Sequence, residues 1–95
     1  MQLLIRGTLV AMADTDFEDF MAALRDGQRF QIGGGRIFRT YAMTNGQLVV
    51  IISDDGYTEE HPCDEATLRA AIAEVPDGWR KFVEWWKAQR SEVPR

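Results

Sequence analysis

Apolar residues recur at helical spacing near the start of the chain. The stripe has the i, i+3, i+4, i+7 pattern of an amphipathic helix and consists of Phe17, Phe20, Met21 and Leu24. Thr15 and Glu18 match the capping box S/T-x-x-E. Gly27 is suited to end the helix, because glycine accepts the left-handed backbone conformation. The pattern therefore predicts a helix over residues 16–25 with Thr15 as its N-cap.

Two further helical stripes lie in the last third of the chain. The first follows Asp64, a favourable N-cap residue, and consists of Leu68, Ala71, Ile72 and Val75. The second follows a break at Pro76-Asp77-Gly78 and consists of Trp79, Phe82, Val83 and Trp86, which are expected in the core. At 100° per residue, Trp85 lies about 105° from the centre of this stripe. Trp85 either widens the core contact or is partly exposed, and an exposed tryptophan is a typical interface anchor.

Between these helices the pattern changes to short strands and tight turns. Asn45-Gly46 and Asp55-Gly56 are strong signals for type I′ hairpin turns. The run Leu48–Ile52 is apolar without alternation, which predicts a central strand. Glu59 and Glu60 make the last strand a natural edge strand. Strands are predicted over residues 28–32, 36–43, 47–53 and 57–61, with a further one over Gln2–Val10.

The order β-α-β-β-β-β-α-α predicts an α+β fold. It consists of an antiparallel sheet of four or five strands with the helices packed on one face. The 95 residues are 45% hydrophobic and 11% aromatic, which is enough for one domain with its own core. We therefore assign residues 1–95 to a single domain, with a tail after about residue 90 that is expected to fray.

Cysteine usage and the first residues bear on the compartment. Cys63 is the only cysteine, so an intrachain disulfide and a cysteine zinc cluster are excluded, and a cytoplasmic protein is expected. The apolar segment Met1–Ile5 is short, and Arg6 follows it, whereas a signal peptide carries its positive charge first. We expect no membrane partner.

The charge is unevenly distributed. The chain carries a net charge of −4, but residues 53–77 alone carry −7 and residues 78–95 carry +3. One interpretation is a solvated edge strand, turn and helix start, where acids are locally favoured. The other is a negative patch that meets a basic protein, because complementary charge speeds association. The overall acidity argues against direct nucleic-acid binding, and −4 is too little for a full mimic of DNA.

Candidate catalytic groups are few. His61 and Cys63 lie two residues apart near Glu59, and a metal site or a Cys-His pair at this position is a remote alternative. Pro62 lies between them, and the chain contains no second histidine. The Gly33-Gly34-Gly35 segment lacks a phosphate-loop motif and precedes a strand rather than a helix. We expect no enzyme activity, no cofactor and no metal.

In size, acidity and lack of a catalytic set, the chain looks like small inhibitors such as immunity proteins or phage-encoded anti-CRISPR proteins. This likeness is compositional and carries over no residue. The sequence thus predicts a non-enzymatic, acidic protein-binding module that inhibits a larger, locally basic complex of the kind that handles nucleic acid. The alternative is a self-associating structural subunit, such as a homodimer. The predicted partner-binding residues are Asp54, Asp55, Tyr57, Glu59, Glu60 and Trp85.

Overall fold

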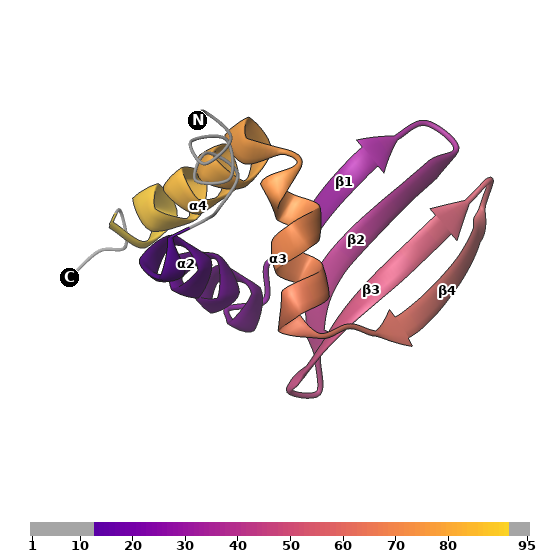
Figure 1. Cartoon of the computed structure of the whole chain (residues 1–95), viewed down its shortest axis with the longest axis horizontal. Helices are drawn as coiled ribbons and strands as arrows, with labels where there is room; N and C mark the ends of the chain where they lie inside the picture. The colour runs from indigo at the N-terminus through magenta and orange to yellow at the C-terminus, as the bar shows by residue number, and fades with distance from the viewer. Residues whose placement is uncertain (1–12, 92–95) are drawn as a thin grey trace, which may run out of the picture.

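The computed structural model of this chain describes residues 13–91, with side chains to residue 90. The strand predicted over Gln2–Val10 and the end of the C-terminal tail lie outside them. The elements in chain order are α2 (Asp14–Arg25), β1 (Phe30–Gly34), β2 (Ile37–Thr44), β3 (Gln47–Asp54), β4 (Tyr57–Pro62), α3 (Glu65–Ala73) and α4 (Pro76–Ser91). The α+β class is confirmed, with four strands and three helices in this part of the chain (Figure 1).

Helix α2 begins two residues earlier than the sequence predicts. Its N-cap is Ala13, whose side chain makes no capping hydrogen bond, so the predicted capping box with Thr15 as N-cap is wrong. The Phe17 N–H donates to the Ala13 carbonyl at 3.0 Å, so the helical hydrogen bonds already begin before Thr15. Asp14 and Asp16 lie in the first turn, where negative charge is favourable at the positive end of the helix dipole.

The end of α2 follows the prediction at Gly27. The Gly27 N–H donates to the Leu24 carbonyl at 3.0 Å, and the Gln28 N–H donates to the Ala23 carbonyl at 3.1 Å. These two bonds form a Schellman motif, which requires a positive φ at the residue after the cap. Gly27 supplies it with φ of 97°.

The two C-terminal helices follow each other closely. Asp64 caps α3 as predicted, because its Oδ1 accepts from the Thr67 N–H at 2.7 Å. This hydrogen bond lowers the pKa of the Asp64 carboxyl.

The predicted break over residues 76–78 is instead the first turn of α4, which begins at Pro76. Proline suits the first position of a helix because its missing N–H has no helical partner there.

The sheet is a simple antiparallel meander. Its strands lie in the order β1-β2-β3-β4, so the run Leu48–Ile52 is on an internal strand, as predicted. Asn45-Gly46 and Asp55-Gly56 have positive φ at both positions, which confirms the two type I′ turns. β4 is exposed along its whole length and lies at the edge of the sheet that residues 13–91 form, as predicted.

The register sorts the side chains of the sheet onto two sides. On one side, called the helix-facing side, three rows cross the strands. The inner row is Phe30, Tyr41, Val50 and His61. The middle row is Ile32, Arg39, Ile52 and Glu59. The outer row is Gly34, Ile37, Asp54 and Tyr57. The opposite side, called the open side, carries Phe38, Ser53, Thr58 and Glu60.

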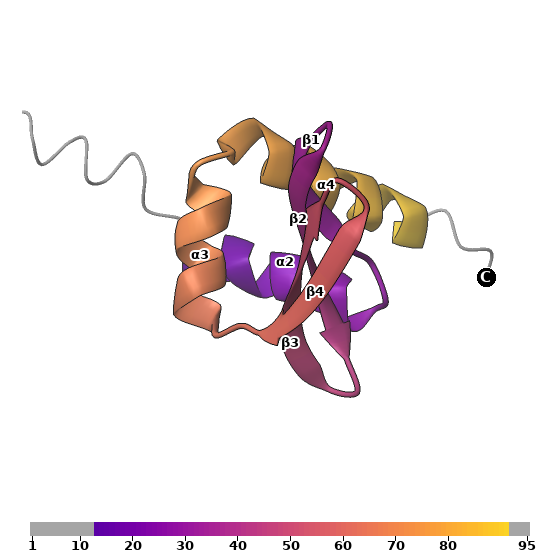
Figure 2. The same cartoon turned by 90° about the vertical axis from the view of Figure 1, so that its right-hand side faces the viewer.

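The helices cover only part of the helix-facing side. The buried core cluster takes residues from all three helices and, from the sheet, Phe30, Tyr41 and Leu48. Three rings hold the layers together, because the centroids of Phe20, Phe30 and Phe82 lie 5.1–5.3 Å apart. The predicted core positions of α4 are buried or half-buried. The outer row takes no part in the cluster, and the sheet extends past the helices (Figure 1). Figure 2 is viewed from this end of the sheet, with α2 and α4 behind the strands.

Within residues 13–91, no helix combines the length and apolar character that crossing a membrane requires.

Candidate functional site

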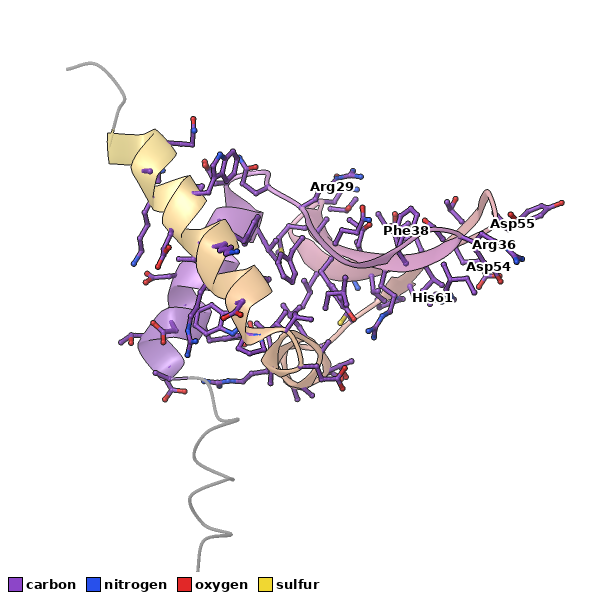
Figure 3. The ribbon with its side chains drawn as sticks, turned by 90° about the horizontal axis from the view of Figure 1, so that it is seen from above. Arg29, Arg36, Phe38, Asp54, Asp55 and His61 are labelled. Carbon is purple, nitrogen blue, oxygen red and sulfur yellow. The ribbon has the colours of Figure 1, made fainter. Side chains whose placement is uncertain are left out.

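Five of the six predicted partner-binding residues lie on the hairpin of β3 and β4. Asp54 ends β3, Asp55 is in the turn, and Tyr57, Glu59 and Glu60 lie on β4. Strand alternation separates them, because Asp54, Tyr57 and Glu59 are on the helix-facing side whereas Glu60 is on the open side. Asp54 and Asp55 gather at the end of the sheet that points away from the helices (Figure 3). This end is called the hairpin tip and comprises residues 34–37 and 54–57.

A shallow hollow of about 390 Å³ lies at the hairpin tip. It is lined by Arg36, Ile52, Asp54, Asp55, Tyr57 and Glu59. Ile52 is half-buried, and the Tyr57 side chain is 81% exposed. The hollow thus combines an apolar side chain and an aromatic ring with three carboxylates and one guanidinium. This combination suits the aliphatic stem and cationic head of a lysine or arginine side chain.

Two contacts join the turns of the hairpin tip. The Asp55 N–H donates to the Arg36 carbonyl at 2.7 Å, and Arg36 Nε lies 3.5 Å from Asp55 Oδ1. Both side chains are largely exposed, so this ion pair contributes little to stability. The backbone hydrogen bond extends the ladder between β2 and β3 by one residue beyond Ile37 and Asp54. It holds the two turns side by side, which fixes the rim of the hollow.

Further along β4, His61 Nε2 and Glu59 Oε1 lie 3.1 Å apart on the same side of the sheet. On β2, Arg39 Nη1 donates to the Tyr41 hydroxyl at 3.2 Å. Arg39 and Glu59 belong to the same middle row, with Ile52 between them. The helix-facing side therefore changes from apolar under the helices to charged toward the hairpin tip.

The acids of residues 53–77 do not share one side of the molecule. Asp54 and Asp55 lie at the turn end of β4, whereas Asp64 and Glu65 lie beyond its other end, at the start of α3 (Figure 1). Asp64 is engaged as the cap of α3. The negative charge available to a partner is therefore divided between the hairpin and α3.

The structure does not bring Trp85 next to the other predicted site residues. Trp85 lies in the C-terminal half of α4, which Figure 1 shows on the far side of the helices from the hairpin tip. Its side chain is 48% exposed, whereas its neighbour Trp86 is buried and donates from Nε1 to Asp26 Oδ2 at 2.8 Å. Trp85 is thus a half-exposed ring at a second location.

The remaining sequence candidates are Cys63 and the glycine segment before β2. Cys63 is half-buried and its Sγ contacts the Asp64 carbonyl at 3.4 Å. Burial raises the pKa of the Cys63 thiol, whereas a nucleophilic cysteine needs a lowered one. Within the described residues, no group of three or more His, Cys, Asp or Glu side chains is placed to hold a metal ion. The segment Gly33-Gly34-Gly35 ends β1 and forms a turn between two strands.

Sequence reasoning missed Arg36 and Ile37 of the hairpin tip, and Ile52, which lines the hollow beside it. Ile37 is 59% exposed, although an isoleucine in a strand is expected to be in the core. Alternate residues of a strand lie on the same side of the sheet, so Ile37 and Arg39 share the side of Tyr41. Alternation along β2 could therefore have grouped these three residues. Only the tertiary structure shows that the helices end before they reach Ile37.

Comparison with family models, curated proteins and solved structures finds no match for this chain.

Proposed function

We propose that this chain is a non-enzymatic binding module that inhibits a larger protein or complex. Its hairpin tip covers a locally basic surface of that partner, of the kind that handles nucleic acid. The observation that carries the proposal is the hollow beside Tyr57, where an exposed aromatic ring and half-buried Ile52 are bordered by Asp54, Asp55 and Glu59. An aromatic anchor with a charged rim is a common composition for a protein–protein interface.

The charges of the hairpin support a basic partner. Arg36 lines the hollow together with three carboxylates and forms an ion pair with one of them, Asp55. Asp54 and Glu59 are both exposed to a partner cation, although Glu59 Oε1 also lies 3.1 Å from His61 Nε2. Such complementarity raises the association rate and excludes acidic partners. The resemblance in size and acidity to immunity and anti-CRISPR proteins is in keeping with an inhibitor that acts by covering a surface.

The test starts with a tagged pull-down from lysate of the source organism in the presence of nuclease. Association of the captured partner is then measured with the Glu59→Lys/Glu60→Lys double variant. We expect the association rate to fall by about tenfold or more at low salt, because steering by the hairpin charge is reversed.

A Glu74→Lys/Glu84→Lys double variant is the matched control, because it changes the net charge equally at two exposed sites outside the hairpin. Circular dichroism establishes that both variants are folded. Equal association rates for the two variants, or binding that survives charge reversal at low and moderate salt alike, would rule the proposal out. Capture of the chain by itself, with a dimer in light scattering, would favour the self-associating subunit.

A further inference from the structure

β4 leaves backbone groups unpaired along one edge of the described sheet. The type I′ turn makes Asp54 and Tyr57 a hydrogen-bonded pair, and hydrogen-bonded pairs then alternate along the ladder. The bond from the Cys63 N–H to the Leu48 carbonyl at 3.0 Å fixes the same parity. The N–H and C=O groups of Thr58 and Glu60 therefore point outward, away from β3.

The position of Pro62 is consistent with this alternation of inward-facing and outward-facing backbone groups. It is the next outward-facing position, and a proline has no N–H to donate. The outward edge thus offers two donors, at Thr58 and Glu60, and three acceptors, at Thr58, Glu60 and Pro62. All of these residues are exposed.

The opposite edge of the described sheet is less suited to pairing. Gly33 has a positive φ of 95°, which departs from regular strand geometry. Its outward carbonyl already accepts from Gln31 Nε2 at 3.3 Å. Of the two edges, β4 presents the regular row of backbone groups, and these groups have no partner among residues 13–91.

The side chains of β4 indicate what pairs there. Glu59 extends to the helix-facing side and Glu60 to the open side, so the edge is negative on both. A second copy of β4 would place like charges opposite each other, which is unfavourable. An extended segment with lysine or arginine at adjacent positions would place a cation opposite each glutamate.

We infer that the partner binds by adding an extended, basic strand to the outer edge of β4. This inference rests on the proposed function and specifies how the same hairpin would hold its partner. Main-chain hydrogen bonds would supply the register, and the carboxylates on the two sides would select a basic segment.

The probe is the peptide acetyl-TVKKVT-amide, added at millimolar concentration to the ¹⁵N-labelled full chain. Hydrogen exchange of the Thr58 and Glu60 amides is expected to slow by about tenfold at saturation. The amides of Tyr57 and Glu59 already bond within the hairpin and should change little. The peptide acetyl-TVEEVT-amide is the matched control and should not bind.

A pair of variants tests the backbone directly. Thr58→Pro removes an outward N–H without removing a bond to β3, and Thr58→Val keeps that N–H. We expect Thr58→Pro to weaken binding of the lysine peptide by about tenfold or more and Thr58→Val to leave it within about twofold. Circular dichroism and the amide spectrum of the helices establish that both variants are folded.

The outcomes separate this inference from the proposed function. Salt-sensitive binding that Glu59→Lys/Glu60→Lys removes, but that Thr58→Pro leaves intact, would overturn strand addition and leave the acidic surface as the binding site. Unchanged exchange at Thr58 and Glu60 with the lysine peptide would also overturn it. Slow exchange of both amides in the free chain would show that this edge is already paired, which overturns the inference as well.

Discussion

At the scale of single residues, Tyr41 is a buried side chain whose polar hydroxyl has a hydrogen-bond partner. Its side chain is 1% exposed and belongs to the core cluster, and its hydroxyl accepts from Arg39 Nη1 at 3.2 Å. Burial raises the pKa of Tyr41 and outweighs the opposite effect of the Arg39 charge. The core thus holds the phenol in its neutral form.

This environment predicts a loss of stability in alkali. The unfolded phenol ionises near its ordinary pKa of 10.0, and the folded one only at higher pH. The Tyr41 contribution is therefore complete below that value and is lost as the pH rises through the folded pKa. Urea unfolding of the wild type and of Tyr41→Phe, at neutral pH and above pH 10, measures it.

At neutral pH, the free energy of unfolding of Tyr41→Phe is expected to be about 1 kcal/mol lower than that of the wild type, because the hydrogen bond from Arg39 is lost. In alkali, the stability of this variant should decrease less steeply with pH than that of the wild type. Burial also raises the pKa of Cys63, but this thiol is present in both proteins and cancels in the comparison. Parallel pH profiles would contradict the assignment to Tyr41.

At the scale of elements, the glycines between β1 and β2 differ although they are neighbours. Gly33 has a φ of 95°, and a Cβ at this position would lie 3.3 Å from the Ile37 carbonyl oxygen. A Cβ on Gly34 would meet nothing within 4 Å, and Gly34 has no positive φ. Of these two neighbours in the hairpin connection, Gly33 therefore requires glycine and Gly34 does not.

Alanine substitution should therefore separate the two positions. We expect Gly33→Ala to lower the free energy of unfolding by about 1–2 kcal/mol, because it places a side chain in the left-handed region against the β2 backbone. Gly34→Ala should change it by less than about 0.5 kcal/mol. Thermal or urea unfolding of both variants is the measurement, and equal losses would show that the Gly33 conformation is not the cause.

At the scale of the whole molecule, the helices cover only one part of the sheet. Ala42 and Val49 are a hydrogen-bonded pair on β2 and β3 near the core, and Phe38 and Ser53 are a pair on the same strands near the hairpin tip. Apolar contacts with the helices reach the inner part of these strands and stop before Ile37 and Asp54. Local stability should therefore decrease along the same two strands.

Native-state hydrogen exchange can test this gradient. The amides of Ala42 and Val49 are expected to exchange through global unfolding, whereas those of Phe38 and Ser53 should exchange at least about tenfold faster through local opening. The denaturant dependence should be steep for the inner pair and shallow for the outer pair. A single rate and slope for both pairs would show that the hairpin tip opens only when the whole domain unfolds.

Local patterns in the sequence predicted the described helices and strands and the two type I′ turns. The spacing of Phe17, Phe20 and Leu24 and the turn at Asn45-Gly46 are local signals, because helix periodicity and positive φ depend on residues a few positions apart. The same holds for the cap at Asp64. The start of α2 was misplaced because the pattern of Thr15 describes a favourable cap and does not require it to be used.

How these elements form a surface depends on their packing in three dimensions. Whether Ile37 and Tyr57 are covered depends on where the helices end over the sheet, and the distance of Trp85 from the hairpin depends on how α4 packs. The separation of Glu59 from Glu60 follows from alternation, but only the register shows which of them faces the hollow. These properties arise from contacts between residues far apart in the chain, which local patterns do not contain.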